Sequence, residues 1–398
     1  MIDLALSDEQ QLLRETARKF AREEIRPTAE RITRSEALRK EPWSACRELF
    51  RKGVELGFTR MLLPEAYGGM GRKLIDAVIA FEELGAGDLS IAGDYFSLTA
   101  TVPLAIAAFA SEAQKRSWLP ELCSGEPLLL AGALSEPNVA GSELFCPTPD
   151  PRLGIRTHAR REGDHYVING QKSAFVTNAG VADRYFLLCR TSLDEPQGRA
   201  ISVFYLPANT AGLRPGKRTE MIGWQASHHA ELFLDGVVAP ESSRIGPEGQ
   251  GLMLMASLAQ MPVALAACFV GLARSAYETA LDYARQRRSW GAPIAQHQAV
   301  ALRLADMYAD VHAARLIVWD AALGLDAGAP EAGAIKAPLA KTAAVDAAIR
   351  NAQRCVEIMG GYGITTEYPA GRFLQDAWIG YSCDFTRDML RLGMAAAL

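Results

Sequence analysis

The spacing of apolar residues changes twice along this chain of 398 residues, and that change limits the folds available to it. From residue 7 to about 124, apolar residues recur every three to four positions, as they do on amphipathic helices. Between about 128 and 240 the sequence alternates and contains turn signals at 162–164 and at Asn169-Gly170. Long helical patterns then return at 251–287, 295–326, 332–359 and 370–397.

This order of patterns predicts a multidomain α+β protein. We expect an N-terminal helical domain at 1–127, a central antiparallel β domain at 128–244 and a C-terminal bundle of four helices at 245–398. Three such domains form a cleft where they meet, and the cleft can shut a flat cofactor away from water.

Charge and cysteine content exclude several classes of function. The chain has 42 Lys and Arg against 46 Asp and Glu, a net charge of -4. Without a basic surplus, we expect it to bind neither nucleic acid nor an anionic membrane. The seven cysteines are scattered and form no CxxC pair, and His228-His229 has no acidic or cysteine neighbour at ligand spacing. We therefore expect no disulfide framework and no metal site.

Two segments bear on the location of the protein. Near the N-terminus, acidic residues stand where a signal peptide has a basic region, and Ser7 with Gln10 forms a capping-box pattern that begins a helix. The 23 residues from Gly251 to Ala273 carry no charge and could span a bilayer by length. This stretch contains Pro262 and stands alone, so we interpret it as a buried helix. We expect a cytoplasmic protein without membrane insertion.

Two motifs near the β domain have both a structural and a cofactor-binding interpretation. The segment Ala133-Leu-Ser-Glu-Pro137, followed by Ala140-Gly-Ser142, is either a polar loop or a place where backbone approaches the oxygen-rich edge of a flavin. Phe175 and Thr177, two residues apart on a strand, point to one face. They are either a core ring beside a solvated hydroxyl or a support for a flavin and its N5 atom.

Two further motifs lie in the C-terminal helical region. Arg287-Arg-Ser-Trp-Gly291 falls between two predicted helices, and arginine suits a pyrophosphate because its fork donates hydrogen bonds in pairs. The segment from Glu357 to Gly363 ends a helix with three glycines, where the backbone turns or passes close to another group.

In this order, these segments resemble the acyl-CoA dehydrogenase family over nearly the whole chain. The matching motifs are LSEPxxAGS, NGxK with TNA, GWxAS at Gly223–Ser227, RxxWGxPIxxxQ, GGYG with EYP through Arg372, and Asp376-Ala-x-Ile. The resemblance implies an N-terminal helical domain, a central β-barrel, a C-terminal four-helix bundle, non-covalent FAD, and a tetramer built as a dimer of dimers.

The resemblance also assigns residues to the cofactor. Ser135 and the backbone near Leu134 would meet the flavin pyrimidine, Thr177 its N5 region, and Phe175 would flank the ring. The residues that would contact the phosphates and the ADP half, several of them across a subunit interface, are Ser142, Arg287, Trp290, Gln298, Glu357, Gly360, Gly361, Thr386 and Asp388. Glu357 stands where relatives more often have Gln.

The catalytic base is where this chain departs from the family pattern. Most relatives have Glu in a Tyr-Glu-Gly-Thr segment, whereas this chain has Cys383, Asp384 and Phe385 before Thr386. The Asp side chain is shorter by one C–C bond, about 1.5 Å. Asp384 is either a base matched to a different substrate or an acid that only accepts a hydrogen bond at a helix end, with catalysis lost. Asp94 is either a second carboxylate at the site or a solvated loop acid.

These features predict an FAD-dependent acyl-CoA dehydrogenase acting on a cyclic or branched acyl group. The base would remove the proton alpha to the thioester carbonyl, and the hydride from the beta carbon would pass to flavin N5, giving a 2-enoyl thioester. The expected partners are an acyl-CoA or acyl-carrier thioester and an electron-transfer flavoprotein or other acceptor. Two alternatives remain open: a nitroalkane-oxidase-like flavin oxidase or monooxygenase, and a non-catalytic subunit that completes the FAD site of a mixed tetramer.

Overall fold

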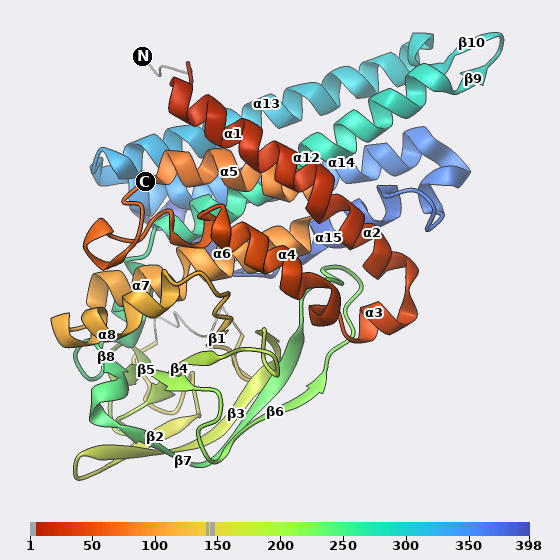
Figure 1. The fold of residues 1–398 in the computed structure, drawn as a ribbon. Helices are drawn as coiled ribbons and strands as arrows, with labels where there is room; N and C mark the ends of the chain where they lie inside the picture. Colours follow the sequence, from red (N-terminus) through yellow and green to blue (C-terminus); the bar gives the residue numbers. More distant parts are fainter. Residues whose placement is uncertain (1–4, 141–142, 144–147) are drawn as a thin grey trace.

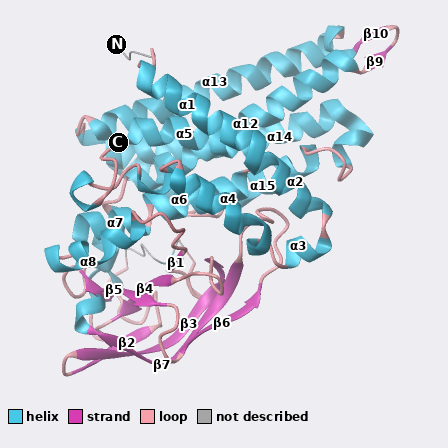
Figure 2. Ribbon diagram, in the orientation of Figure 1, coloured by secondary structure: helices cyan, strands magenta, loops and turns pink. Residues whose placement is uncertain are grey.

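Helices from both ends of the chain form one body, and a β-sheet lies against one side of it (Figures 1 and 2). The computed structural model describes residues 5–140, 143 and 148–398. The predicted order of helical, β and helical segments is confirmed. Helices α4, α6 and α7 lie between the sheet and the long helices (Figure 1).

The N-terminal helices begin with the predicted capping box. The Ser7 hydroxyl accepts a hydrogen bond from the Gln10 N–H at 3.3 Å, and the Gln10 side chain accepts one from the Ser7 N–H at 3.2 Å. The α-helices of this region are α1 (Asp8–Phe20), α2 (Arg26–Arg34), α3 (Glu36–Lys40), α4 (Trp43–Glu55), α5 (Leu74–Gly87), α6 (Leu89–Ala100), α7 (Val102–Phe109) and α8 (Glu112–Leu122). A π-helical turn, Ala21–Ile25, joins α1 to α2, so the chain does not leave helical conformation before Pro27.

The sheet is open, and the predicted β-barrel is wrong for the described residues. Its strands are β1 (Leu130–Ala133), β2 (His158–Glu162), β3 (His165–Thr177), β4 (Arg184–Arg190), β5 (Ile201–Pro207), β6 (Leu213–Arg218), β7 (His229–Pro240) and β8 (Arg244–Ile245). They run in the order β6-β7-β3-β2-β4-β5-β8, with β1 paired to β4. The edge strand β8 has two residues, too few for a closing ladder. The sheet is also not wholly antiparallel, because β1 and β2 both run parallel to β4.

One of the two predicted turns is wrong as well. The chain turns between β2 and β3 at Gly163 as expected, but Asn169-Gly170 lies inside β3, where the register with β7 shifts. A Cβ at Gly170 would lie 2.7 Å from the Thr157 Cα, so close contact between backbones explains this glycine. The Asn169 side chain accepts a hydrogen bond from the Gly236 N–H at 2.8 Å.

The C-terminal region has three long helices, and two of its predicted helices are broken. The helices are α11 (Gly251–Ala256), α12 (Gln260–Gln286), α13 (Gln298–Asp326), α14 (Ala337–Met359), α15 (Ala370–Ile379) and α16 (Arg387–Ala397). Thus the predicted helix at 370–397 is two helices separated by residues 380–386. Helix α5 packs tightly on α12, since a Cβ at Gly271 would lie 2.1 Å from the Glu82 carbonyl oxygen. The bundle around α12 therefore includes an N-terminal helix.

The uncharged stretch Gly251–Ala273 forms α11 and the first half of α12, most of which is buried. A different stretch of the described chain, Leu89–Phe109, is long and apolar enough to cross a membrane by length and composition. It spans α6 and α7, and 72% of its most apolar window is buried inside the protein.

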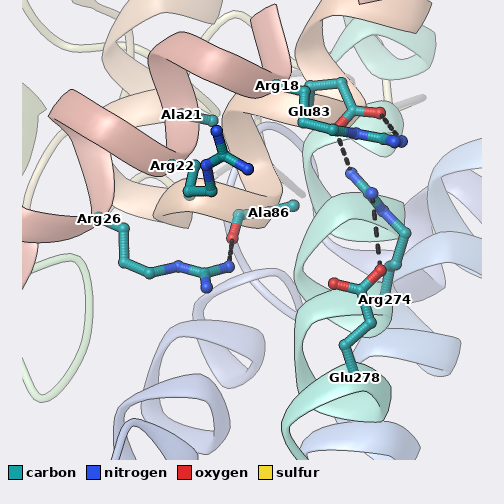
Figure 3. Close-up of a pocket in the computed structure, with 9 residues that line it drawn as sticks. Arg18, Ala21, Arg22, Arg26, Glu83, Ala86, Arg274 and Glu278 are labelled. Carbon is teal, nitrogen blue, oxygen red and sulfur yellow. Dashed lines mark hydrogen bonds and ion pairs between the residues drawn. The ribbon is translucent and has the colours of Figure 1, made fainter. Parts of the chain in front are cut away.

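A charged cluster joins the N-terminal and C-terminal helices. Glu83 of α5 accepts hydrogen bonds from Arg18 of α1 at 2.8 Å and Arg274 of α12 at 2.6 Å, beside a cavity of about 220 Å³ (Figure 3). Glu82 likewise pairs with Arg315 of α13 at 2.7 Å. Burial opposes ionisation of Glu82, but the arginine hydrogen bonds and charges outweigh it and hold its pKa below the ordinary value. Glu278, 3.7 Å from Arg274, supplies a third carboxylate for these three arginines, so we interpret this cluster as structural.

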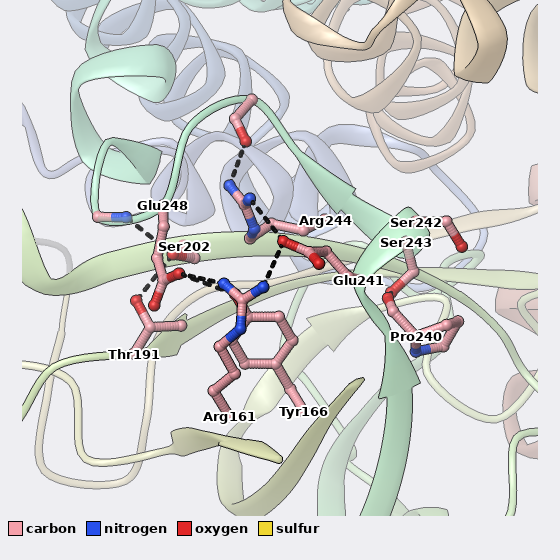
Figure 4. A network of polar contacts seen from close by, with 12 residues as sticks. Arg161, Tyr166, Thr191, Ser202, Pro240, Glu241, Ser242, Ser243, Arg244 and Glu248 are labelled. Atoms are coloured by element: carbon pink, nitrogen blue, oxygen red, sulfur yellow. Dashed lines mark hydrogen bonds and ion pairs between the residues drawn. The ribbon is translucent and has the colours of Figure 1, made fainter. Parts of the chain in front are cut away.

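A second polar network ties the far end of the sheet together (Figure 4). Arg161 of β2 donates to Glu241 at 2.8 Å, and Tyr166 of β3 donates to Glu248 at 2.8 Å. These bonds fix the segment that leaves the sheet toward α11.

Candidate active site

The end of strand β3 presents an aromatic ring and a hydroxyl on one face, as predicted. Phe175 is 64% exposed and Thr177 is half-buried, whereas Val176 between them is buried on the other face. An exposed phenyl ring beside a hydroxyl gives a surface that a flat aromatic ring system can cover.

Thr177 has a partner that the sequence analysis did not identify. Its hydroxyl lies 3.3 Å from Nε2 of His229, the residue opposite it on β7. Burial, followed by the charge of Arg218, lowers the pKa of His229 to about 4, so this imidazole is neutral at pH 7. Local sequence patterns offered His229 only as a candidate metal ligand, because they do not reveal the β3–β7 register that brings it to Thr177.

A buried ion pair fixes the loop after β1 against β3. Lys172 is 0% exposed and donates hydrogen bonds to Glu136 at 3.0 Å and to the Leu134 carbonyl at 3.1 Å. The hydroxyls of Ser135 and Ser173 lie 2.8 Å apart. The structure therefore brings Leu134 and Ser135 to the same strand that carries Phe175 and Thr177. Ser142, the remaining predicted residue of this motif, lies outside the described residues.

The loop between β6 and β7 connects this strand to the C-terminal helices. The Trp224 N–H donates to the Asp376 side chain in α15 at 2.7 Å, and a Cβ at Gly223 would lie 2.5 Å from the Gln375 carbonyl oxygen. The Trp224 ring centroid is 6.4 Å from that of His229. Its buried indole N–H has no hydrogen-bond partner among the described residues.

Asp384 lies in the segment between α15 and α16. Its φ is 41° and that of Phe385 is 69°, the left-handed region in which residues other than glycine are strained. Asp384 is exposed to solvent. Partial loss of hydration nevertheless raises the pKa of its carboxyl group, and the charge of nearby Lys341 opposes this increase.

Asp94 is not a solvated loop acid. It lies in α6 and is 3% exposed, with one carboxyl oxygen accepting a hydrogen bond from Ser227 at 3.0 Å. The other oxygen has no partner among the described residues. Burial raises the pKa of Asp94 to about 8; the Ser227 hydrogen bond opposes this increase and the charge of Asp88 adds to it.

The residues predicted to hold the ADP half lie elsewhere on the subunit. Arg287 follows α12, and Trp290, 96% exposed with φ 51°, lies in the turn of a small hairpin at the end of the helices away from the sheet (Figure 1). Gln298 begins α13. Glu357 accepts a hydrogen bond from Gln353 at 3.0 Å near the end of α14.

The remaining predicted residues lie at helix ends. Gly360, with φ 59°, and Gly361 follow α14 directly. The Thr386 hydroxyl caps α16, and Asp388 in its first turn accepts a hydrogen bond from Tyr381 at 3.3 Å.

Comparison with known proteins shows similarity to a single family over nearly the whole chain. Residues 7–126, 131–237 and 249–398 match the models of the N-terminal, middle and C-terminal domains of acyl-CoA dehydrogenase. An acyl-CoA dehydrogenase of Bacillus subtilis is 35% identical, covering 97% of each chain. A mitochondrial isobutyryl-CoA dehydrogenase of Dictyostelium discoideum is 31% identical over 94% of this chain and 85% of that protein. The structure of butyryl-CoA dehydrogenase from Megasphaera elsdenii has a TM-score of 0.90 at 29% identity, covering 100% and 99% of the two chains.

The surface around β3 fits the cofactor of such enzymes. Phe175 offers an exposed apolar face, Thr177 and Ser135 offer hydroxyls, and Trp224 has a spare indole donor. A flavin needs such apolar contact along its ring and hydrogen bonds at its edge. The chain belongs to the acyl-CoA dehydrogenase family and is an FAD-dependent oxidoreductase.

Proposed function

We propose that this enzyme oxidises a cyclic or branched acyl thioester, with Asp384 as the base that removes the alpha proton. Bound FAD would supply the hydride acceptor at N5. The observation that carries this proposal is the break between α15 and α16, which places a carboxyl group of raised pKa on a strained backbone. Strain of this kind is typical of active sites, because surrounding contacts must hold it in place.

The backbone at Asp384 also suits the substrate carbonyl. Its N–H has no hydrogen-bond acceptor among the described residues and remains available to a thioester oxygen. A donor at this oxygen stabilises the negative charge that develops as the alpha proton leaves. The loss of hydration that raises the pKa of Asp384 strengthens the carboxylate as a base.

The shorter side chain supports a substrate that is not linear. Asp reaches about 1.5 Å less far than Glu, and a misplacement of about 1 Å can reduce the rate a hundredfold. A ring or branch near the reacting carbon would bring that carbon to a shorter base. The named relatives with butyryl-CoA and isobutyryl-CoA activity set the size range for a first panel of substrates.

We further propose that the cofactor site is completed by a second copy of the chain. The hairpin that carries Trp290 lies at the end of the helices away from the sheet with Phe175 and Thr177 (Figure 1). Arg287, Trp290 and Gln298 would then reach the ADP half of FAD in a neighbour, as in a homotetramer. Glu357, Gly360, Gly361, Thr386 and Asp388 would join them. An electron-transfer flavoprotein, in the cytoplasm, would accept the electrons.

A panel of thioesters tests the substrate proposal. Linear, branched and cyclic acyl-CoA compounds are added anaerobically, each also as the acyl-carrier thioester, and loss of flavin absorbance is recorded. We expect the fastest loss with a branched or cyclic group. Asp384→Glu, which restores the length of the usual base, should shift the preference toward linear groups. Equal preference in wild type and this variant would contradict the proposed link between base length and substrate shape.

A further inference from the structure

Lys341 of α14 has an unusual environment for a lysine. It is 1% exposed, and its ammonium group donates hydrogen bonds to the carbonyl groups of three consecutive residues. These are Cys383, Asp384 at 2.7 Å and Phe385 at 2.8 Å. An ammonium group has three N–H donors, so the segment around the proposed base uses all of them.

Two of these three carbonyl groups belong to residues with strained backbone. Asp384 and Phe385 are consecutive residues with positive φ, and neither is glycine. The left-handed conformation is unfavourable for residues that have a Cβ, so other contacts must hold the backbone in it. The segment also lies outside the helices: α15 ends at Ile379 and α16 begins at Arg387. Lys341 therefore supplies hydrogen bonds to carbonyl groups that lie outside any helix.

The charge of Lys341 also acts on the base. Partial loss of hydration raises the pKa of Asp384, and Lys341 is the charged group that opposes this increase. The thiols of Cys383 and of Cys268, on the neighbouring α12, have pKa values raised by burial and stay neutral. Farther along α14, Asp346 is paired with Arg387 at 2.7 Å and with Arg391 at 2.8 Å, so its charge is already compensated.

We propose that Lys341 is a positioning residue for Asp384, because its ammonium group holds the backbone of the base in the left-handed conformation. This inference rests on Asp384 being the base of the proposed reaction. It explains how an aspartate and a phenylalanine occupy a backbone geometry that glycine adopts without strain.

Replacement of Lys341 by Met tests this role in the FAD-loaded enzyme. The rate of anaerobic flavin reduction and the dissociation constant of the thioester are measured separately. Displacement of the base by about 1 Å should lower the rate by about a hundredfold with little change in thioester affinity. Loss of the positive charge should also move the acid limb of the pH profile to higher pH. The control Lys336→Met, which removes a lysine paired with Asp320 at the surface end of the same helical segment, should behave like wild type.

A glycine at position 385 distinguishes positioning from general stability. Phe385→Gly lowers the strain of the loop, so it should restore the rate of Lys341→Met by about tenfold, the factor that corresponds to about 1.4 kcal/mol. The same glycine in the wild-type background should not increase the rate. If Lys341→Met does not fold, Lys341→Gln, which keeps two donors, takes its place and should lose less activity.

Three results separate failure of this inference from failure of the proposed function. Lys341→Met that reduces its flavin at the wild-type rate, while Asp384→Asn does not, would overturn the positioning role alone. Failure of Phe385→Gly to restore any rate would do the same. Wild-type reduction by Asp384→Asn would instead overturn the assignment of the base.

Discussion

The buried ion pair of Lys172 and Glu136 fixes the loop after β1 against β3, and its removal gives a direct prediction about stability and FAD binding. Lys172→Met keeps the length of the side chain but removes its charge and its hydrogen bonds to Glu136, Leu134 and Leu188. Glu136 keeps its bonds from the N–H groups of Arg156 and Thr157 at 2.7 and 2.8 Å. It nevertheless becomes a buried carboxylate without a counter-ion.

The size of the effect follows from these contacts. Removing one partner of a buried pair typically destabilises a protein by about 3–5 kcal/mol, because the other charge is left uncompensated. Here two carbonyl groups also lose a donor. Replacing both residues, as in Lys172→Met with Glu136→Gln, removes the unpaired charge, keeps an acceptor oxygen for the N–H groups of Arg156 and Thr157, and should recover part of the loss.

The assay is thermal unfolding, followed by circular dichroism, together with the FAD content of the purified protein. We expect Lys172→Met to have a clearly lower Tm and reduced FAD occupancy, and the double variant to recover part of the loss in Tm. The control Lys40→Met removes a pair with Glu36 in which both side chains are exposed, and should not change Tm measurably. A Lys172→Met protein as stable as Lys40→Met would refute the reasoning.

Three further predictions concern single residues. In the folded wild type Asp94 keeps its proton up to its pKa of about 8, whereas the unfolded chain releases this proton near 3.9, so wild type should lose stability relative to Asp94→Asn as pH rises between these values. The Tm of both proteins is measured at about pH 5 and about pH 9, and a difference in Tm that stays constant would contradict this prediction. Because the pKa of His229 is about 4, the flavin spectrum should not change between about pH 6 and pH 8, and a transition there that His229→Ala abolishes would contradict the assignment of a neutral imidazole. Arg287→Ala should weaken FAD binding by about tenfold or more without altering the helical content, since one charged hydrogen bond contributes about 1.5–3 kcal/mol. The dissociation of FAD is followed on dilution of the enzyme, and an unchanged FAD affinity would argue against a cofactor contact at the hairpin.

Features set by neighbouring residues were predicted correctly from the sequence. The capping box of Ser7 and Gln10 depends on residues three apart, and the common face of Phe175 and Thr177 depends on the period of a strand. The order of helical and β regions follows from the same local patterns. The family motifs were likewise readable because each is a short segment.

Features set by distant residues were not predictable in this way. The pairing of Lys172 with Glu136 joins residues 36 apart, and that of Thr177 with His229 depends on the β3–β7 register. The sheet stays open because of how its edge strands are placed, which no local pattern shows. The predicted helix at 370–397 spanned 380–386, yet the chain leaves helical conformation there, and Lys341, about 40 residues earlier, binds this backbone.

The central claim is that the carboxylate of Asp384 removes the alpha proton of a thioester. The most direct test is anaerobic flavin reduction by Asp384→Asn, a variant of nearly the same size and shape, with the best substrate of the panel. We predict that FAD and thioester still bind and that the reduction rate falls by at least about 10²- to 10⁴-fold, the contribution of a general base. Reduction at the wild-type rate would contradict the account.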